Sequence, residues 1–143
     1  MFLKKKYNCK KLLMRDDPLL DINIEGWIKT KRSSKNVTFI ELNDGSSQSN
    51  IQIVVNDETE LSEPLETLST GASVSVKGAL IESQGANQKW EVSSTSVSVL
   101  GYCDSDYPLQ KKRHSDEFLR GIAHLRGRTN KYAALARIRS QLS

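Results

Sequence analysis

Hydrophobic and polar side chains alternate along most of the chain between residues 22 and 100. In residues 22–31, one face holds Ile22, Ile24, Gly26, Ile28 and Thr30, and the other holds Asn23, Glu25, Trp27, Lys29 and Lys31. This period of two predicts a strand with one buried face. The same reasoning predicts strands at residues 37–42, 50–55, 72–82 and 89–100, separated by polar turn sequences.

A helix fits only between the third and fourth of these strands, where residues 64–69 have room for one or two turns. Five strands with a helix after the third match the order of the OB-fold, an all-β five-stranded barrel. Other five-stranded barrels share this order. OB-fold barrels bind oligonucleotides on the face of their second and third strands. The pattern therefore predicts a nucleic-acid-binding surface on residues 37–55.

The two ends of the chain have a different character. Residues 1–15 are expected to be a basic and weakly ordered start, with a short helix at 10–15. After the last strand, an extended linker leads to a helix at 117–125, which Ser115 caps, and to a second helix at 130–142. We therefore divide the chain into a basic segment (1–19), the barrel (20–102), and a linker with a helical appendage (103–143).

Composition leaves room for a small domain and excludes several functional classes. The chain has 143 residues, of which 37% are hydrophobic, and no apolar run approaches the ~20 residues needed to cross a bilayer. Cys9 and Cys103 are far apart, and His114 and His124 have no ligand partners at metal-binding spacing. Phosphate-loop and hydrolase motifs are absent from the sequence. We predict a cytoplasmic chain without a catalytic or metal site of its own.

The net charge of +4 conceals an acidic middle between two basic flanks. Residues 1–15 hold six basic and no acidic side chains, residues 16–107 hold six and fifteen, and residues 108–143 hold nine and two. Four of the basic residues in the middle lie close together, at Lys29, Lys31, Arg32 and Lys35. Such a cluster on an acidic background is typical of a contact with a polyanion, although a solvated loop has the same composition.

Strand alternation singles out Phe39 and Gln52. Ile40 and Leu42 take the core side of the second strand, and Ile51 and Ile53 that of the third, so Phe39 and Gln52 are expected on the outer face. An exposed aromatic ring can stack on an unpaired base, and an amide can read a base edge. Arg32 lies near them at the end of the first strand. The alternative is that Phe39 covers the barrel end and that Gln52 is merely solvated.

These residues lie in segments with a recognisable family resemblance. The sequences IEGWIKTKR (24–32), FIELNDGS (39–46) and NIQIVV (50–55) resemble the anticodon-binding domain of aspartyl- and asparaginyl-tRNA synthetases. The stretch YPLQKKRHSDEFLRGIAHL (107–125) is more specific and resembles the hinge that follows this domain in asparaginyl-tRNA synthetases. The resemblance runs from about residue 12 to residue 143.

The resemblance implies roles for particular residues. Arg32, Phe39 and Gln52 match the residues that contact the anticodon in this family, where the Phe stacks on the central uridine and the Gln hydrogen-bonds it. Further contacts with the anticodon or with phosphates are expected from Lys29, Lys31, Lys35, Gln84, Asn87, Lys89 and Glu91. Hinge contacts with tRNA are expected from Lys111, Lys112 and Arg113.

The resemblance also implies a function. The chain would recognise the anticodon of asparagine tRNA within a homodimeric asparagine–tRNA ligase, whose catalytic domain uses ATP and Mg²⁺. That catalytic domain is absent from this sequence, so we expect the chain alone to be inactive and the 130–142 helix to pack on the missing domain. The alternatives are a free-standing OB-fold nucleic-acid-binding protein and an aspartate-specific or non-discriminating relative.

Overall fold

The computed structural model describes residues 6–143 and divides into two compact units, one ending at Tyr107 and the other running from Pro108 to Ser143. The strands are β1 (Lys6–Tyr7), β2 (Leu19–Ser33), β3 (Val37–Asn43), β4 (Ile51–Asn56), β5 (Glu60–Leu61), β6 (Ser73–Glu82) and β7 (Trp90–Gly101). The helices of the first unit are α1 (Cys9–Leu13) and the single 3₁₀ turn η1 (Leu65–Thr67). Those of the second unit are α2 (Asp116–Gly121), α3 (Ala123–Arg126) and α4 (Asn130–Leu142).

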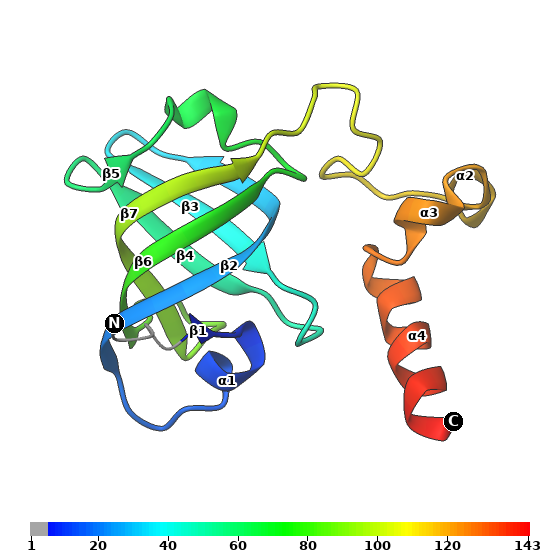
Figure 1. Ribbon diagram of the computed structural model, residues 1–143, viewed down its shortest axis with the longest axis horizontal. Helices are drawn as coiled ribbons and strands as arrows, with labels where there is room; N and C mark the ends of the chain where they lie inside the picture. Colours follow the sequence, from blue (N-terminus) through cyan, green and yellow to red (C-terminus); the bar gives the residue numbers. More distant parts are fainter. Residues whose placement is uncertain (1–5) are drawn as a thin grey trace. The chain divides into compact units, whose positions relative to one another are not determined.

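Five long strands close into a barrel (Figure 1). β2 pairs antiparallel with β3 and β6, β3 with β4, and β6 with β7, and a parallel pairing of β4 with β7 completes the ring. These strands and the position of η1 confirm the predicted OB-fold order. The two-residue strands β1 and β5 pair parallel with β2 and β7. Alternation did not predict them, because two residues are too few to display a period.

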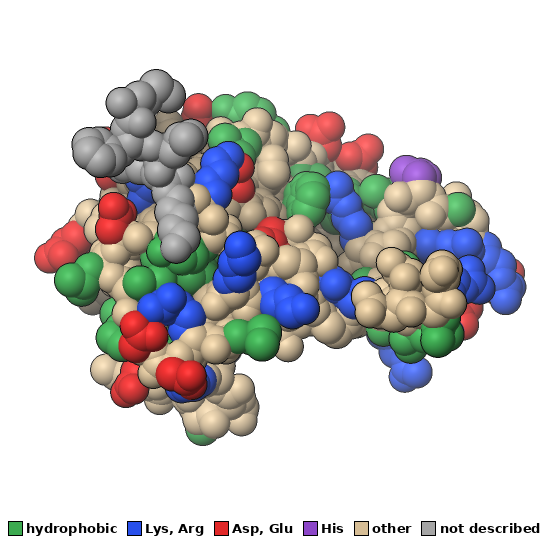
Figure 2. All heavy atoms as spheres, turned by 60° about the horizontal axis from the view of Figure 1, so that its bottom comes forward, with side chains coloured by type: hydrophobic (Ala, Val, Ile, Leu, Met, Phe, Trp, Pro, Cys, Tyr) green, Lys and Arg blue, Asp and Glu red, His purple; other side chains and the backbone are tan. Residues whose placement is uncertain are grey.

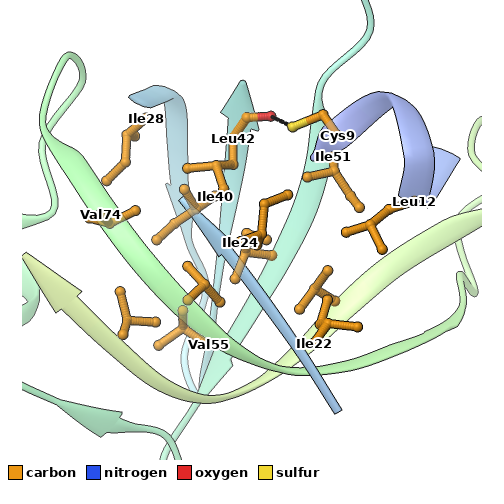
Figure 3. Packing of buried hydrophobic residues seen from close by; sticks show 14 of the residues in the cluster. Cys9, Leu12, Ile22, Ile24, Ile28, Ile40, Leu42, Ile51, Val55 and Val74 are labelled. Atoms are coloured by element: carbon orange, nitrogen blue, oxygen red, sulfur yellow. Dashed lines mark hydrogen bonds between the residues drawn. The ribbon is translucent and has the colours of Figure 1, made fainter. Parts of the chain in front are cut away.

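The core follows the predicted alternation closely (Figure 3). The core residues are those that strand parity assigns to the inner face, including Ile22, Ile24, Ile28, Ile40, Leu42, Ile51, Ile53, Val55, Val74, Val76 and Leu80. Each buried residue of this size contributes roughly 1.5–3 kcal/mol to the transfer of apolar surface out of water. The inner face therefore fixes which side chains of the same strands point outward.

Helix α1 belongs to the core, which makes the expectation of a weakly ordered start wrong for residues 6–15. Its Cys9 and Leu12 are fully buried (Figure 3), and the Cys9 thiol lies 3.7 Å from the Leu42 carbonyl oxygen that accepts its hydrogen bond. The Asn8 side chain caps the helix by accepting from the Lys11 N–H. The lysine-rich composition suggested disorder, but the two apolar side chains on one face were the better signal. Residues 1–5 of the predicted segment lie outside the described residues.

A bulge in β2 changes the faces predicted for its last residues. Ile28 pairs with Leu42, but the next pair is Thr30 with Glu41, so Lys29 is the extra residue. Beyond the bulge, Thr30 lies on the outer face, where its hydroxyl donates to Glu41 at 2.9 Å. Lys31 pairs with Ile40 and turns toward the inner side. The prediction that put Thr30 on the core face and Lys31 outward is therefore wrong, because a bulge shifts the alternation by one residue.

The second unit is helical, as predicted, with one difference. The Ser115 hydroxyl accepts from the Phe118 N–H at 3.2 Å and so caps α2 as expected. The predicted single helix at 117–125 is divided at Ile122 into α2 and α3, whose lengths are six and four residues. Helix α4 has the predicted bounds. Its apolar side chains are largely exposed, with Ile138 at 57% and Leu142 at 83%.

Candidate nucleic-acid interface

Two rows of side chains cross the outer face of β2, β3, β4 and β7. The register pairs Arg32 with Phe39, Phe39 with Val54, and Val54 with Ser93. The neighbouring row consists of Thr30, Glu41, Gln52 and Glu91, again in direct register. Because side chains that are paired across strands share a face, the barrel brings together all three residues that were predicted to contact the anticodon.

Phe39 and Arg32 form a cation–π pair at one end of this face. The Arg32 guanidinium carbon lies 5.1 Å from the centroid of the Phe39 ring. Phe39 is half-buried and Arg32 is exposed. Part of the Phe39 side chain is therefore packed against the barrel, and the rest is accessible to solvent. Regular alternation after Ile28 would have turned Arg32 inward. The bulge at Lys29 thus places the guanidinium beside the ring, where a stacked base would meet both groups.

Gln52 lies between two carboxylates. Its Nε2 donates to Glu91 Oε2 at 3.0 Å, across the parallel β4–β7 pair, and its register partner on the other side is Glu41. Glu41 Oε2 accepts from the Thr30 hydroxyl at 2.9 Å and from the Asn50 amide at 3.4 Å. Glu91 Oε2 also accepts from the Ser83 hydroxyl at 2.8 Å. The amide is therefore held in a hydrogen-bonded frame rather than freely solvated.

The other predicted residues of the barrel are less uniform. Lys31 Nζ donates to the Leu65 carbonyl oxygen at 3.0 Å, which attaches the end of β2 to η1. Lys89 Nζ lies 3.2 Å from the Arg15 carbonyl oxygen and 3.3 Å from an Asp16 carboxylate oxygen, so it joins the β6–β7 loop to the segment after α1. Lys35, Gln84 and Asn87 are exposed on loops, and Lys29 is half-buried at the bulge.

Within the second unit, Lys111, Lys112 and Arg113 are exposed on the segment that leads into α2. Directly after these three residues, His114 forms a stacked pair with Phe118, and the two ring centroids lie 5.4 Å apart. The three cations thus follow one another on an exposed stretch of backbone, a suitable arrangement for phosphate contacts.

Sequence reasoning missed Ser83 and its contact with Gln88, which lies in the loop from which Gln84, Asn87 and Lys89 were predicted to make contacts. The Ser83 hydroxyl accepts from the Gly85 N–H at 3.1 Å and from Gln88 Nε2 at 3.0 Å, while it donates to Glu91. The signal in the sequence was only a polar loop, residues 84–88, and Ser83 ended a predicted strand. Their connection to Gln52 depends on the pairing of β4 with β7, which no local pattern reveals.

The described residues hold no group of three or more His, Cys, Asp or Glu side chains that could bind a metal ion. Among the helices of residues 6–143, none has the length and apolar character to span a membrane. On the face of the first unit that Figure 2 shows, Lys and Arg side chains are interspersed with acidic and polar ones. The candidate site is defined by the aromatic and amide groups of the two rows.

Comparison with known proteins identifies the family of the barrel and its relatives. The family described as OB-fold nucleic acid binding domain matches residues 22–100. The asparagine–tRNA ligase of Oleidesulfovibrio alaskensis is 52% identical over 127 residues, and the match covers 88% of this chain and 28% of the relative. The asparagine–tRNA ligase of Bacteroides fragilis is 52% identical over 132 residues, which cover 92% of this chain and 28% of the relative. The chain thus spans about 28% of the length of these curated relatives.

Solved structures show the same fold. The asparaginyl-tRNA synthetase of Pyrococcus horikoshii in complex with asparaginyl-adenylate matches 96% of this chain and 32% of its own, with a TM-score of 0.80 and 24% identity. The aspartyl-tRNA synthetase of Entamoeba histolytica matches 95% of this chain and 35% of its own, with a TM-score of 0.71 and 14% identity. With the family match over more than half of its residues, the chain belongs to the OB-fold nucleic acid binding domains.

Proposed function

We propose that this chain recognises the anticodon of asparagine tRNA as part of an asparagine–tRNA ligase. The observation that carries the proposal is the placement of Arg32, Phe39 and Gln52 on one outer face of the barrel. Sequence identity of 52% to two asparagine–tRNA ligases supports the choice of family. The sequence of residues 107–125, which resembles the hinge of asparaginyl-tRNA synthetases, supports asparagine over aspartate.

Each of the three residues has a chemical task in this proposal. The Phe39 ring stacks on the central anticodon base, which contributes about 1–3 kcal/mol per stacked base. Gln52 hydrogen-bonds the Watson–Crick edge of that base, and Arg32 binds the base or a neighbouring phosphate. Lys29, Lys35, Gln84 and Asn87 supply peripheral contacts around this centre. Lys111, Lys112 and Arg113 bind the tRNA backbone from the second unit.

The remaining steps belong to the rest of the ligase. In this proposal its catalytic domain forms asparaginyl-adenylate with ATP and Mg²⁺ in the cytoplasm, and the enzyme works as a homodimer. The exposed apolar side chains of α4, which include Leu135, Ile138 and Leu142, pack on that domain. This chain supplies recognition and no catalytic group.

Replacing Phe39 tests the proposal most directly. We expect Phe39→Ala to weaken binding of an RNA hairpin with the asparagine anticodon by about 1–3 kcal/mol, because the stacking platform is lost. Fluorescence anisotropy titration measures this affinity, and circular dichroism checks that the barrel is intact. Phe39→Trp is the matched control and should retain binding, since a larger ring still stacks. Unchanged affinity in folded Phe39→Ala would contradict the proposal.

The leading alternative is an OB-fold protein that binds single strands without reading an anticodon. The outer face alone fits both functions, but the alternative does not explain the similarity of residues 107–125 to the synthetase hinge. Hairpins that differ only in the central loop base separate the two functions. Anticodon recognition requires unequal affinities, whereas equal affinities for all four bases would favour the alternative.

A further inference from the structure

Gln52 can present either end of its amide to a base, and the two ends select opposite partners. The carbonyl oxygen accepts from an N–H, as on the imino position of uracil or guanine, whereas the NH₂ group donates to the bare ring nitrogen of cytosine or adenine. Which end faces the RNA therefore decides which bases fit. In this structure that choice is made by Ser83 and Glu91, which hold the amide instead of contacting the base.

The orientation of the Gln52 amide can be traced through a series of hydrogen bonds that begins at the backbone N–H of Gly85. The Gly85 N–H can only donate, and it donates to the Ser83 hydroxyl oxygen, which also accepts from Gln88 Nε2. A hydroxyl has one proton and two lone pairs. With both lone pairs engaged, the Ser83 proton is directed to Glu91 Oε2 at 2.8 Å.

The same Glu91 oxygen determines the orientation of the Gln52 amide. An ionised carboxylate accepts hydrogen bonds and donates none, so the group of Gln52 that lies 3.0 Å from Glu91 Oε2 has to be the NH₂. The reverse orientation would bring the amide oxygen against the carboxylate oxygen. Among the described residues no group donates to the Gln52 carbonyl oxygen, so this oxygen is the acceptor that the amide has left for a base. Glu41, the register partner on the opposite strand, adds a second negative charge that favours N–H donors over acceptors.

We infer that Ser83 and Glu91 are positioning residues that fix the Gln52 amide with its carbonyl toward the RNA, and so make this face select a base with an imino N–H. The inference rests on the proposed function, because it concerns how the same site chooses its base. Between the two pyrimidines this orientation favours uracil, the base that the family resemblance already implies, over cytosine, which lacks the imino proton; the new element is the role of Ser83 and Glu91.

The test compares hairpins with uracil, cytosine or an abasic residue at the central loop position, titrated against the full chain by fluorescence anisotropy. One hydrogen bond gained or lost at a buried base edge corresponds to about a tenfold change in affinity, so the wild-type chain should prefer uracil over cytosine by about tenfold. In Glu91→Ala the amide is free to rotate, and the preference should fall to about twofold or less. Affinity for the abasic hairpin should be the same in both chains, because this hairpin offers no base edge to the Gln52 amide and its phosphate contacts remain.

Two further variants distinguish a positioning role of Glu91 from an effect of its negative charge. Glu91→Gln keeps an acceptor oxygen, and the Ser83 proton selects that oxygen over the new NH₂, so the variant should retain the preference for uracil. Glu82→Ala removes an exposed carboxylate from the neighbouring strand β6 and should also retain it. If Glu91→Gln loses the preference as completely as Glu91→Ala, Glu91 acts through its charge and the positioning role is overturned.

The outcomes also distinguish this inference from the proposed function. A wild-type preference for uracil that persists in Glu91→Ala overturns the positioning role and leaves anticodon recognition standing. A wild-type chain with no preference among the hairpins defeats both. If Glu91→Ala does not fold, Ser83→Ala decides, because it removes the directing proton from a half-buried residue at the end of β6. The uracil preference should then fall by at least about twofold, and an unchanged preference would overturn the inference.

Discussion

The carboxylate of Asp44 attaches helix α1 to the loop between β3 and β4. One oxygen accepts from the Cys9 N–H at 2.9 Å, and the other accepts from the backbone and the hydroxyl of Ser46 at 2.9 and 2.6 Å. The pKa of Asp44 lies below its ordinary value. Partial burial alone would raise this pKa, but the hydrogen bonds from Ser46 and Cys9 lower it by more. The ionised form therefore stabilises the folded chain.

We expect Asp44→Asn to destabilise the barrel by about 1 kcal/mol at neutral pH, since one of the accepting oxygens becomes a donor. The sign of the pH dependence follows from the lowered pKa. The stabilisation is complete above the unfolded-state pKa of about 3.9 and is lost as the pH falls through the lower pKa of the folded state. Urea unfolding at pH 7 and at pH 3 measures both stabilities. A difference between wild type and variant that grows on acidification would contradict this prediction.

The thiol of Cys9 offers a second measure of the same attachment. Burial, with a smaller contribution from the nearby Asp44 charge, raises the pKa of this thiol to about 12. Because the thiolate is the reactive form, we expect Cys9 to resist iodoacetamide at pH 8 in the folded chain. Mass spectrometry should show faster alkylation of Cys9 in Asp44→Asn, where α1 opens more often. Alkylation of Cys9 in the folded wild type at the rate of a free thiol would refute the prediction.

At the scale of elements, the sequence predicted the strands well and the ends of the chain less well. The alternation of Ile, Leu and Val with polar residues is a strong local signal, and the five long strands lie where it placed them. The bulge at Lys29 carries no such signal, because its cause is the fit of β2 against β3 in the closed barrel. The break between α2 and α3 at Ile122 was likewise not predicted, and for α1 the buried Cys9 and Leu12 were a better guide than its lysines.

The pairing of β6 with β7 gives a prediction about Gly78. A Cβ atom at this position would lie 2.1 Å from the Ser93 carbonyl oxygen, which belongs to the neighbouring backbone. The register of this pair also shifts between Lys77 and Gly78. We expect Gly78→Ala to destabilise the barrel by about 1–3 kcal/mol, since the strands have to move apart.

Thermal and urea unfolding measure the effect of Gly78→Ala. Gly85→Ala is the matched control in the same unit, because its Cβ would approach no atom closer than 3.4 Å and the Gly85 N–H remains available to Ser83. We expect the control to unfold like the wild type. Equal stability of the two variants would show that β6 and β7 have more freedom to separate than this register implies.

At the scale of the whole molecule, most of the net positive charge and the residues proposed to read the base lie in different units. Residues 108–143 hold nine basic and two acidic side chains, whereas Gln52 lies between Glu41 and Glu91 on the barrel. On the barrel, Arg32 is the cation that lies beside Phe39. Base selection and general affinity for RNA should respond separately to mutation.

We predict that combined replacement of Lys111, Lys112 and Arg113 by Ala weakens binding of all full-length tRNAs alike. Each phosphate contact contributes about 0.7–0.9 to the slope of log K against log salt, so the slope should become shallower by about 2. Titrations at several salt concentrations between roughly 50 and 300 mM measure this slope. Phe39→Ala is the control and should leave the slope unchanged. A triple variant that altered base preference instead would contradict this separation.

The sequence predicted the central residues of the proposed site but not the contacts that connect them. Phe39 and Gln52 follow from strand parity, and Arg32 from its position at the end of the first strand and from the family resemblance, although it pairs with Phe39 only because of the bulge. Ser83 and Glu91 lie 31 and 39 residues beyond Gln52 in the chain. Interactions at such separations depend on which strands become neighbours, and hydrophobic periodicity predicts the strands without their order.

The parallel pairing of β4 with β7 has a consequence for biosynthesis. Contacts between residues far apart in sequence form slowly, because the intervening chain loses conformational entropy before they are made. Gln52 and Glu91 are 39 residues apart and meet only when this last pair of strands closes the ring. A nascent chain whose β7 is still inside the ribosome lacks the Glu91 that accepts from the Gln52 amide. Under the proposed function, discrimination between bases is therefore acquired only with the completed barrel.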